Sequence, residues 1–119
     1  MGPLANEAHY KSVQNFIERG VEEGAHVVAG GVGHPAGFSR GWYARPTVFS
    51  RVAPDAHVVQ EEAFGPVLVI QTYSNLDEAI ELANRSEFGL SAYVVGADLA
   101  LAQATAGRLH AGMVHVNGA

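Results

Sequence analysis

The fold of this 119-residue chain is organised around one stretch, Gln60-Glu61-Glu62-Ala63-Phe64-Gly65-Pro66-Val67-Leu68-Val69-Ile70. The stretch ends in an unbroken apolar run, Val67 to Ile70, which is typical of a strand covered on both faces. The Gly65-Pro66 pair turns the chain just before this strand, because proline fixes φ and glycine adopts conformations that other residues avoid. We therefore expect Glu62 and Phe64 to lie at the rigid edge of a sheet, where side chains are held in place.

Glu62 and Phe64 have a functional and an ordinary interpretation. The carboxylate of Glu62 can accept hydrogen bonds from ligand hydroxyls, and Phe64 can offer a flat apolar surface to a ring. The ordinary alternative is a solvated acid and a core aromatic, which is what isolated Glu and Phe residues usually are. Adjacent Glu61 and Glu62 point to different faces, so they are not a carboxylate pair aimed at one bond. One of the two is expected to be functional and the other structural or solvated.

Composition excludes several classes of protein. The net charge of −5 and seven scattered Lys and Arg residues argue against a nucleic-acid surface. No apolar run approaches the ~18 residues of a membrane span, and the N-terminus lacks the basic start and apolar block of a targeting peptide. A cytoplasmic location is therefore expected. The chain has no cysteine, which excludes disulfides, thiolate metal sites and a cysteine nucleophile within it.

Hydrophobic periodicity predicts the elements of the first half. The expected elements are a helix from Asn6 to Glu23 with Asn6 as N-cap and Gly24 as stop, a strand His26–Ala29, a glycine-rich surface loop Gly31–Gly41 and an extended segment within Pro46–Val52. The loop lacks the glycine spacings of phosphate-binding motifs.

The second half alternates between strands and helices. The expected elements are a helix from Ser74 with a buried stripe of Leu76, Ala79, Ile80 and Ala83, a strand Ser91–Val95, a helix from Asp98 to about Leu109 with Leu101, Ala104 and Thr105 facing inward and Gly112 as its C-terminal residue, and a strand Met113–Val116. Such alternation favours an α/β fold, a mostly parallel sheet with flanking helices. One domain over residues 1–119 is expected.

Six histidines do not form a metal-binding pattern. They stand at positions 9, 26, 34, 57, 110 and 115, without metal-ligand spacing or cysteine companions. Surface histidines, or histidines that support a site, are the expected alternative. No serine occupies a nucleophile-elbow motif either.

Several ordered segments resemble landmarks of the NAD(P)-dependent aldehyde dehydrogenase superfamily. Residues 61–66 resemble its Glu-Glu-x-Phe-Gly-Pro signature. The other landmarks are Gly2-Pro3-Leu4, Glu23-Gly24-Ala25 with Gly30-Gly31, Gly41-Trp42-Tyr43 with Arg45-Pro46-Thr47-Val48, Asp77-Glu78-Ala79-Ile80 with Ala83-Asn84, Phe88-Gly89-Leu90-Ser91-Ala92, and Ala111-Gly112-Met113-Val114 with Val116-Asn117. They follow the family's order and cover nearly the whole chain.

The resemblance implies a reaction and a set of site residues. Members of this family oxidise an aldehyde with NAD or NADP after a cysteine thiolate attacks the carbonyl. By resemblance, Glu62 matches the acid that binds the ribose on the nicotinamide side, and Phe64 matches an aromatic that helps to place the nicotinamide. Leu90 matches a position lining the same region, and Asn117 precedes a loop that shapes the substrate entrance.

The resemblance also implies what this chain lacks. The family's nucleophile, its dinucleotide-binding domain and its general-base glutamate all lie upstream of the segment where this chain begins. The chain therefore resembles the later part of a catalytic domain only, with no catalytic residue and no metal ligand expected in it, and it is expected to be inactive alone. The alternative is a non-catalytic α/β binding or self-assembling module derived from the same family. A homo-oligomer is expected in either case.

Overall fold

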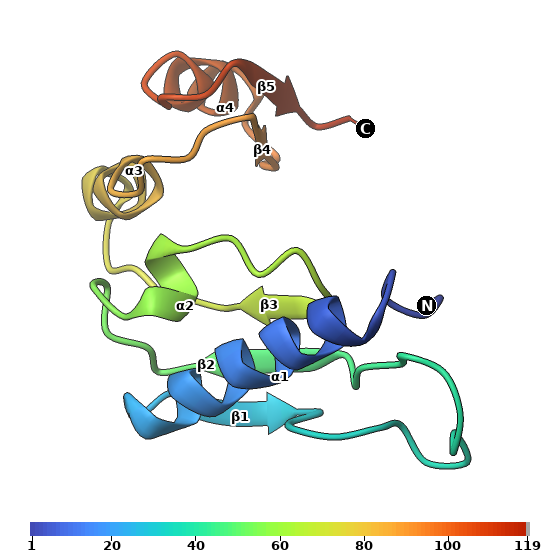
Figure 1. Ribbon diagram of the computed structural model, residues 1–119. Coiled ribbons are helices and arrows are strands. Elements are labelled where there is room, and N and C mark those ends of the chain that lie inside the picture. The colour runs from blue at the N-terminus through green and yellow to red at the C-terminus, as the bar shows by residue number, and fades with distance from the viewer. Residues whose placement is uncertain (119) are drawn as a thin grey trace. The chain divides into compact units, whose positions relative to one another are not determined.

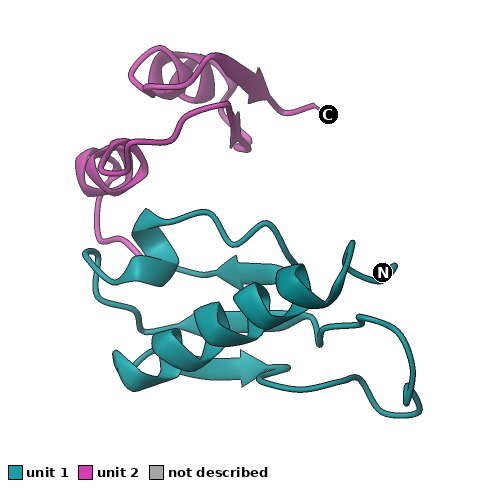
Figure 2. Ribbon diagram, viewed as in Figure 1, with its two compact units in different colours: residues 1–71 teal, residues 72–119 magenta. Residues whose placement is uncertain are grey.

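The computed structural model of the protein describes residues 1–118 and has two compact units, Met1–Gln71 and the part from Thr72 onward (Figure 2). Two of the three strand pairings are parallel, and helices accompany the strands. These features confirm the expected α/β class with mostly parallel strands. The expectation of one domain over residues 1–119 stays a prediction. No helix of the described residues is long and apolar enough to cross a membrane.

The first unit is a helix packed on a three-stranded sheet (Figure 1). Its elements are α1 (Glu7–Glu22), β1 (His26–Ala29), β2 (Thr47–Ser50), α2 (His57–Gln60) and β3 (Val67–Val69). Strand β2 is central, antiparallel to β1 and parallel to β3. The sequence had predicted β1 with these bounds, but it had not predicted the single turn of α2.

The core of the first unit lies between α1 and the sheet. Val13 and Ile17 of α1 and Phe49 of β2 are fully buried, and Val58 of α2 joins the same cluster. Burying each such side chain contributes about 1.5–3 kcal/mol. The predicted period of α1 is thus confirmed, because its apolar face is the one that meets the sheet.

The two ends of α1 follow the predicted signals. The side chain of Asn6 accepts a hydrogen bond from the His9 amide at 2.9 Å, which makes Asn6 the N-cap. Gly24 has a φ of 89° just after the C-cap residue Glu23. Only glycine adopts this left-handed conformation without strain, so the helix ends there.

Strand β3 differs from its prediction. It was expected to be covered on both faces, but Leu68 is 58% exposed and Ile70, just beyond the strand, is 47% exposed. Val67 and Val69 pack against the core. Successive side chains of a strand point to opposite faces, so α1 covers one face and the other face is open within this unit.

A long connection joins β1 to β2. As predicted, the stretch from Gly31 to Gly41 contains no helix or strand. Its base is tied down, because Arg45 Nε donates to His34 O at 2.7 Å and the Tyr10 ring stacks on His34 with centroids 4.8 Å apart. Residues 36–41 at its tip are all exposed.

The second unit contains two helices and a two-stranded parallel sheet. Its elements are α3 (Leu76–Asn84), β4 (Ser91–Val94), α4 (Leu99–Ala106) and β5 (Met113–Val116). Asp98 caps α4, as predicted, by accepting from the Leu101 amide at 3.0 Å. Strand β3 pairs with β2 in the first unit, so the strands of the second half do not form one sheet among the described residues.

The ends of α3 and α4 correct the sequence predictions. Asn75, not Ser74, caps α3, and its side chain accepts from the Glu78 amide at 3.0 Å. Helix α4 ends at Ala106 rather than near Leu109, because the amides of Arg108 and Leu109 donate to carbonyls three residues back instead of four. Gly112 therefore ends no helix, and its amide donates to Gly89 O at 2.8 Å.

The predicted inward faces of these helices are only partly buried. On α3, Ile80 is buried but Ala83 is exposed. On α4, Thr105 is buried as expected, whereas Leu101 and Ala104 are exposed. The buried apolar residue of α4 is instead Ala102, so the predicted inward face of this helix is confirmed only at Thr105.

Candidate functional site

The segment between α2 and β3 places Glu62 and Phe64 at the surface. Phe64 is 76% exposed and its backbone φ is 44°, an uncommon conformation for a bulky residue. Glu62 is also exposed, two residues earlier. The ordinary interpretation of Phe64 as a core aromatic is therefore wrong. The side chain is displayed rather than packed.

The backbone around Phe64 rests on α1 and β2. A Cβ added at Gly65 would lie 2.7 Å from Val13 Cγ2, so a larger residue cannot approach α1 as closely. The Thr47 amide donates to Pro66 O at 2.8 Å. The Phe64 carbonyl lies 2.6 Å from His9 Nε2. The segment is therefore a supported edge of the sheet, as the Gly-Pro turn predicted.

The two adjacent acids have different surroundings. Glu61 Oε1 lies 3.1 Å from Arg19 Nη1, and the Glu61 amide donates to His57 O at 2.7 Å. Glu62 has no hydrogen-bond or ion-pair partner among residues 1–118. Its carboxylate therefore has its acceptor positions free for a ligand. A functional role for Glu62 stays a prediction.

A buried histidine lies beneath this segment. His57 Nδ1 is 2.9 Å from Glu23 Oε2, and His57 Nε2 is 2.9 Å from Phe16 O. Both partners are acceptors, so only the doubly protonated ring donates to both. The hydrogen bonds from the His57 side chain and amide hold the pKa of Glu23 below its ordinary value.

Sequence reasoning missed this pairing of His57 with Glu23. The histidine had been grouped with surface or supporting histidines, although its neighbours Ala56 and Val58 are apolar and buried. These apolar neighbours were the sequence signal for burial of His57, because a histidine between two buried residues is itself expected to be buried. Around it lies a shallow polar hollow of about 380 Å³, lined partly by Arg19 and Gln60.

Leu90 and Asn117 lie in the second unit. Leu90 is 85% exposed and stands just before β4, whereas Asn117 follows β5. Because β4 and β5 are parallel, the two residues lie at opposite ends of this strand pair, about 16 Å apart along the strands. The structure brings Glu62 and Phe64 together in the first unit, but it does not bring Leu90 and Asn117 together in the second.

The side chain of Asn117 is hydrogen-bonded to the backbone of the second unit. Its Oδ1 accepts from the Gly96 amide at 2.9 Å, and its Nδ2 donates to Gly96 O at 2.8 Å. Its own amide donates to Val94 O, and its φ of 53° turns the chain at this point. Asn117 thus joins the ends of β4 and β5.

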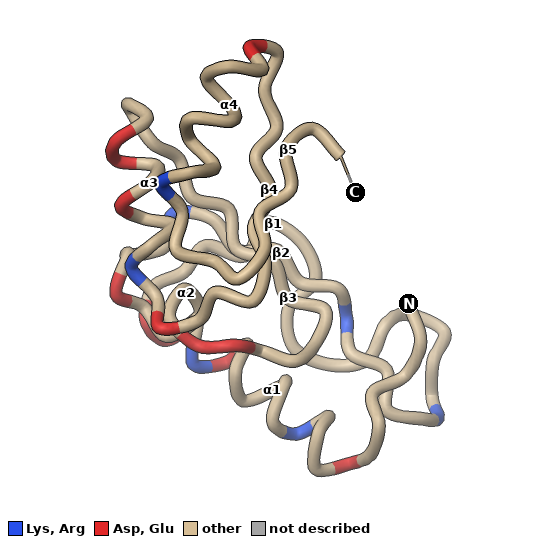
Figure 3. The backbone as a smooth tube through the Cα atoms, turned by 90° about the horizontal axis from the view of Figure 1, so that it is seen from above, with Lys and Arg blue, Asp and Glu red and all other residues tan. Residues whose placement is uncertain are grey.

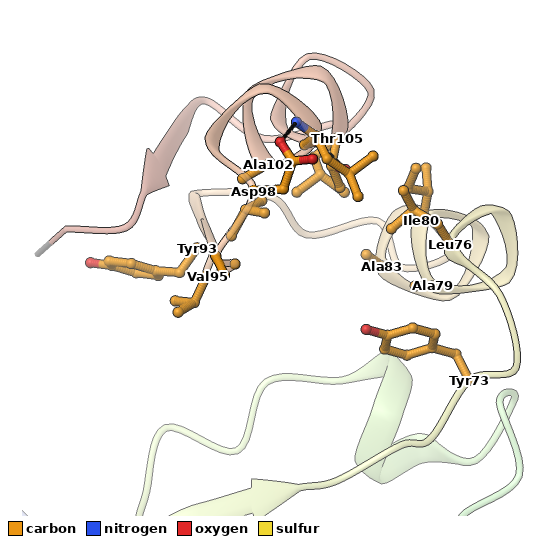
Figure 4. Close-up of a pocket in the computed structure, with 15 residues that line it drawn as sticks. Tyr73, Leu76, Ala79, Ile80, Ala83, Tyr93, Val95, Asp98, Ala102 and Thr105 are labelled. Atoms are coloured by element: carbon orange, nitrogen blue, oxygen red, sulfur yellow. Dashed lines mark hydrogen bonds between the residues drawn. The ribbon is translucent and has the colours of Figure 1, made fainter.

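A hollow of about 440 Å³ opens between α3, α4 and the end of β4 (Figure 4). The predicted α3 stripe of Leu76, Ala79, Ile80 and Ala83 lines it. Two of its polar side chains are used within α4: Asp98 caps the helix, and Thr105 Oγ1 donates to Leu101 O at 2.7 Å. Tyr73 and Tyr93 also line the hollow. The hollow therefore offers mainly apolar contact, with two tyrosine side chains as its remaining polar groups.

Charged side chains do not build a second site. Lys and Arg positions are spread between acidic ones along the chain (Figure 3). Within the described residues, no three His, Asp or Glu side chains come close enough together to hold a metal ion. The segment carrying Glu62 and Phe64 remains the candidate site with free functional groups.

Known proteins match the chain closely. The profile of the aldehyde dehydrogenase family matches residues 1–119. A putative aldehyde dehydrogenase of Staphylococcus haemolyticus (strain JCSC1435) is 44% identical over 117 residues, 98% of this chain and 25% of the relative. A crystal structure of an aldehyde dehydrogenase from Bartonella henselae has a TM-score of 0.97 and 42% identity, covering 100% of this chain and 25% of its own.

Several similar structures carry ligands. A mutant of aldehyde dehydrogenase C from Pseudomonas syringae, in complex with NAD+ and octanal, has a TM-score of 0.96 and 47% identity, covering 99% of this chain and 24% of its own. The chain spans about a quarter of the length of the relatives it matches. The profile match extends over every described element, and the chain belongs to the aldehyde dehydrogenase family.

Proposed function

We propose that this chain is part of an NAD(P)-dependent aldehyde dehydrogenase, which oxidises an aldehyde to a carboxylic acid, and that Glu62 and Phe64 contribute to its cofactor surface. One observation carries the assignment: a carboxylate without a partner among residues 1–118 stands two residues before an aromatic ring displayed on a supported backbone. NAD or NADP, when bound, accepts the hydride that leaves the substrate.

The two side chains fit complementary parts of a dinucleotide. The Glu62 carboxylate can accept hydrogen bonds from both hydroxyls of a ribose, and such charge-assisted bonds are short and strong. The exposed Phe64 ring offers an apolar face to the nicotinamide. Holding ribose and ring together fixes the orientation needed for hydride transfer. The NAD+ complexes of similar enzymes from Pseudomonas syringae and Mycobacterium tuberculosis support a cofactor of this type.

Leu90 and Asn117 make smaller contributions. Leu90 is an exposed apolar side chain and suits the lining of the cofactor region. Asn117 has both amide groups bonded to Gly96. Its proposed contribution to the substrate entrance is therefore to fix where the following loop starts, rather than to touch the aldehyde.

The chain by itself lacks the nucleophile of this reaction. It contains no cysteine, so attack on the aldehyde must come from a residue outside these 119 positions. The isolated chain is accordingly proposed to be inactive. Within a complete enzyme its proposed setting is a cytoplasmic homo-oligomer.

A second function is favoured by the open apolar face of β3. Leu68 and Ile70 are exposed there, and apolar surface of this kind is usually covered by association. A non-catalytic module that self-associates through this face is the alternative to a segment of an enzyme.

The mass of the native polypeptide separates the two functions. Immunoprecipitation from the source cell and intact mass spectrometry should give a species several times heavier than the 12.5 kDa of this chain. A native product of 12.5 kDa would exclude the catalytic function for the molecule itself. In that case light scattering should show an oligomer, and a monomer at micromolar concentration would exclude the alternative as well.

The role of Glu62 is tested by Glu62→Gln in the complete enzyme. The exchange keeps the size of the side chain but removes the charge, so hydride transfer should slow about tenfold or more while the thermal midpoint changes little. Glu22→Gln, an exposed acid on α1, is the matched control. Normal turnover and normal cofactor affinity in Glu62→Gln would show that the proposed role is wrong.

A further inference from the structure

The displayed ring of Phe64 requires a restraint. Its φ of 44° is a conformation that a bulky residue adopts only where the surroundings impose it. The ring itself is 76% exposed, so side-chain packing supplies little of that restraint. The backbone on either side must therefore be held by other groups.

His9 holds the carbonyl of Phe64 from α1. His9 Nε2 lies 2.6 Å from Phe64 O, a contact between residues 55 positions apart. On the other side of the ring, the Ala5 amide donates to His9 Nδ1 at 3.4 Å. Nδ1 thus acts as the acceptor, and Nε2 carries the proton that it donates to the carbonyl.

The histidine is itself fixed by the start of the helix. Its amide donates to the Asn6 side chain that caps α1. Val13, four residues later on the same face of α1, is the side chain that excludes a Cβ at Gly65. Helix α1 thus touches the segment at two successive residues: His9 binds the carbonyl of Phe64, and Val13 packs against Gly65.

We propose that His9 is a positioning residue for the cofactor: its hydrogen bond to Phe64 O fixes the peptide that follows Phe64 and so holds the ring where it meets the nicotinamide. The inference rests on the proposed function, because it assigns His9 a role only through Phe64. Side-chain chemistry permits one conservative replacement, since a glutamine at position 9 also carries an Nε2 donor at the end of its chain.

Hydrogen exchange of the 119-residue chain tests the restraint directly. His9→Ala should speed the exchange of amides 61–65 by about threefold to tenfold, the effect of losing one hydrogen bond. His9→Gln should restore the slow rate. His26→Ala, an exposed histidine on β1, should leave it unchanged. An unchanged rate at residues 61–65 in His9→Ala would overturn the proposal.

Kinetics of the complete enzyme test the consequence. His9→Ala should lower kcat or raise the KM for NAD(P) by about threefold to tenfold, with the KM for aldehyde unchanged. His9→Gln should recover most of the loss. A loss of thermal stability with normal kinetics would show a merely structural role, and so would failure of His9→Gln to rescue a kinetic defect.

A double-mutant cycle with Phe64→Ala separates the two proposals. His9→Ala should add no further loss in the Phe64→Ala background, because there is no ring left to position. An equal further loss would overturn the inference about His9. Normal kinetics of Phe64→Ala alone would overturn the proposed function, whereas a defect in Phe64→Ala with none in His9→Ala would overturn only the inference.

Discussion

The two units of this protein bury apolar surface to very different extents. In the first unit, Val13, Ile17 and Phe49 are all fully buried in one cluster. In the second unit, Ile80 and Ala102 are the buried apolar residues among those described, whereas Leu90 and Val95 are 85% and 84% exposed. The first unit is organised around a buried apolar cluster. The second unit has few buried apolar side chains.

In the second unit, hydrogen bonds connect the elements in place of a large apolar core. Asn84 Nδ2 donates to Arg108 O and Asn84 Oδ1 accepts from the His110 amide, which ties α3 to the connection before β5. Arg108 also lies 2.7 Å from Asp77. Such exposed bonds contribute little net stability, because water competes for the same groups. The difference teaches that hydrogen bonds connect the elements of the second unit, while many of its large apolar side chains stay exposed.

The largest effect is expected from truncating the core of the first unit. Phe49→Ala should lower the free energy of unfolding by about 3–5 kcal/mol, because it leaves a cavity between α1 and the sheet. Urea unfolding can be followed by the fluorescence of Trp42, the only tryptophan, which lies in this unit.

Ile80→Ala is the matched truncation in the second unit. Ile80 borders the open hollow, so its removal enlarges a space that is already accessible and should cost about 2 kcal/mol, the lower end of the range for such truncations. Hydrogen exchange of the β4 and β5 amides measures it. Equal losses in Phe49→Ala and Ile80→Ala would contradict the contrast between the two units.

A smaller effect is expected from acid. The pKa of Glu23 is lowered in the folded state by its bonds with His57, so this contact stabilises the first unit above the ordinary carboxyl pKa of about 4.3. The stabilisation is lost as the pH falls through the lower folded pKa. Glu23→Gln should therefore lower the free energy of unfolding at neutral pH. It should also make that free energy depend less on pH below about 5.

The same titration separates Glu23 from its neighbours. Arg19 forms ion pairs with both Glu23 and Glu61, so a change at either acid alters the charge around the other. Glu61→Gln removes only an exposed ion pair. In this variant the free energy of unfolding should still fall with decreasing pH as it does in the wild type, and this fall is the acid branch of the stability curve. An acid branch that is identical in the wild type and in Glu23→Gln would refute the linkage.

The smallest effect is expected at Asn117. Asn117→Ala removes two hydrogen bonds to Gly96 and puts a poor residue at a φ of 53°, with an expected loss of about 1 kcal/mol. Asn117→Gly removes the same bonds but suits the backbone, so it should cost less. Exchange rates of the Val94–Gly96 amides measure both. If Asn117→Gly lost as much as Asn117→Ala, the side-chain bonds alone would account for the effect.

Local signals predicted local features. The Asn6 cap, the Gly24 stop, the bounds of β1 and β5 and the Asp98 cap each depend on a few adjacent residues, and each is confirmed. The family was predicted in the same way, from short segments in a fixed order. The displayed position of Phe64 followed less directly, since Gly65-Pro66 predicted a turn but not a left-handed Phe64.

Features that depend on partners far along the chain were not predictable. The apolar run Val67–Ile70 indicates burial on both faces, but whether anything covers the second face depends on other segments. The pairing of His57 with Glu23 joins residues 34 positions apart, and the contact of His9 with Phe64 O joins residues 55 apart. The sequence around each of these residues does not predict which distant residue it contacts.

The exposed tip between β1 and β2 has a practical consequence. Arg45, His34 and Tyr10 fix the base of this connection, so the path of the chain is set before residues 36–41 are reached. A segment whose ends are already held can lengthen at little entropic cost, since each doubling of a loop costs only about 0.6 kcal/mol. An affinity tag or a fluorescent label inserted at this tip should therefore leave α1 and its seat beneath Phe64 unaltered, which makes it a suitable attachment point for following the protein in the cell.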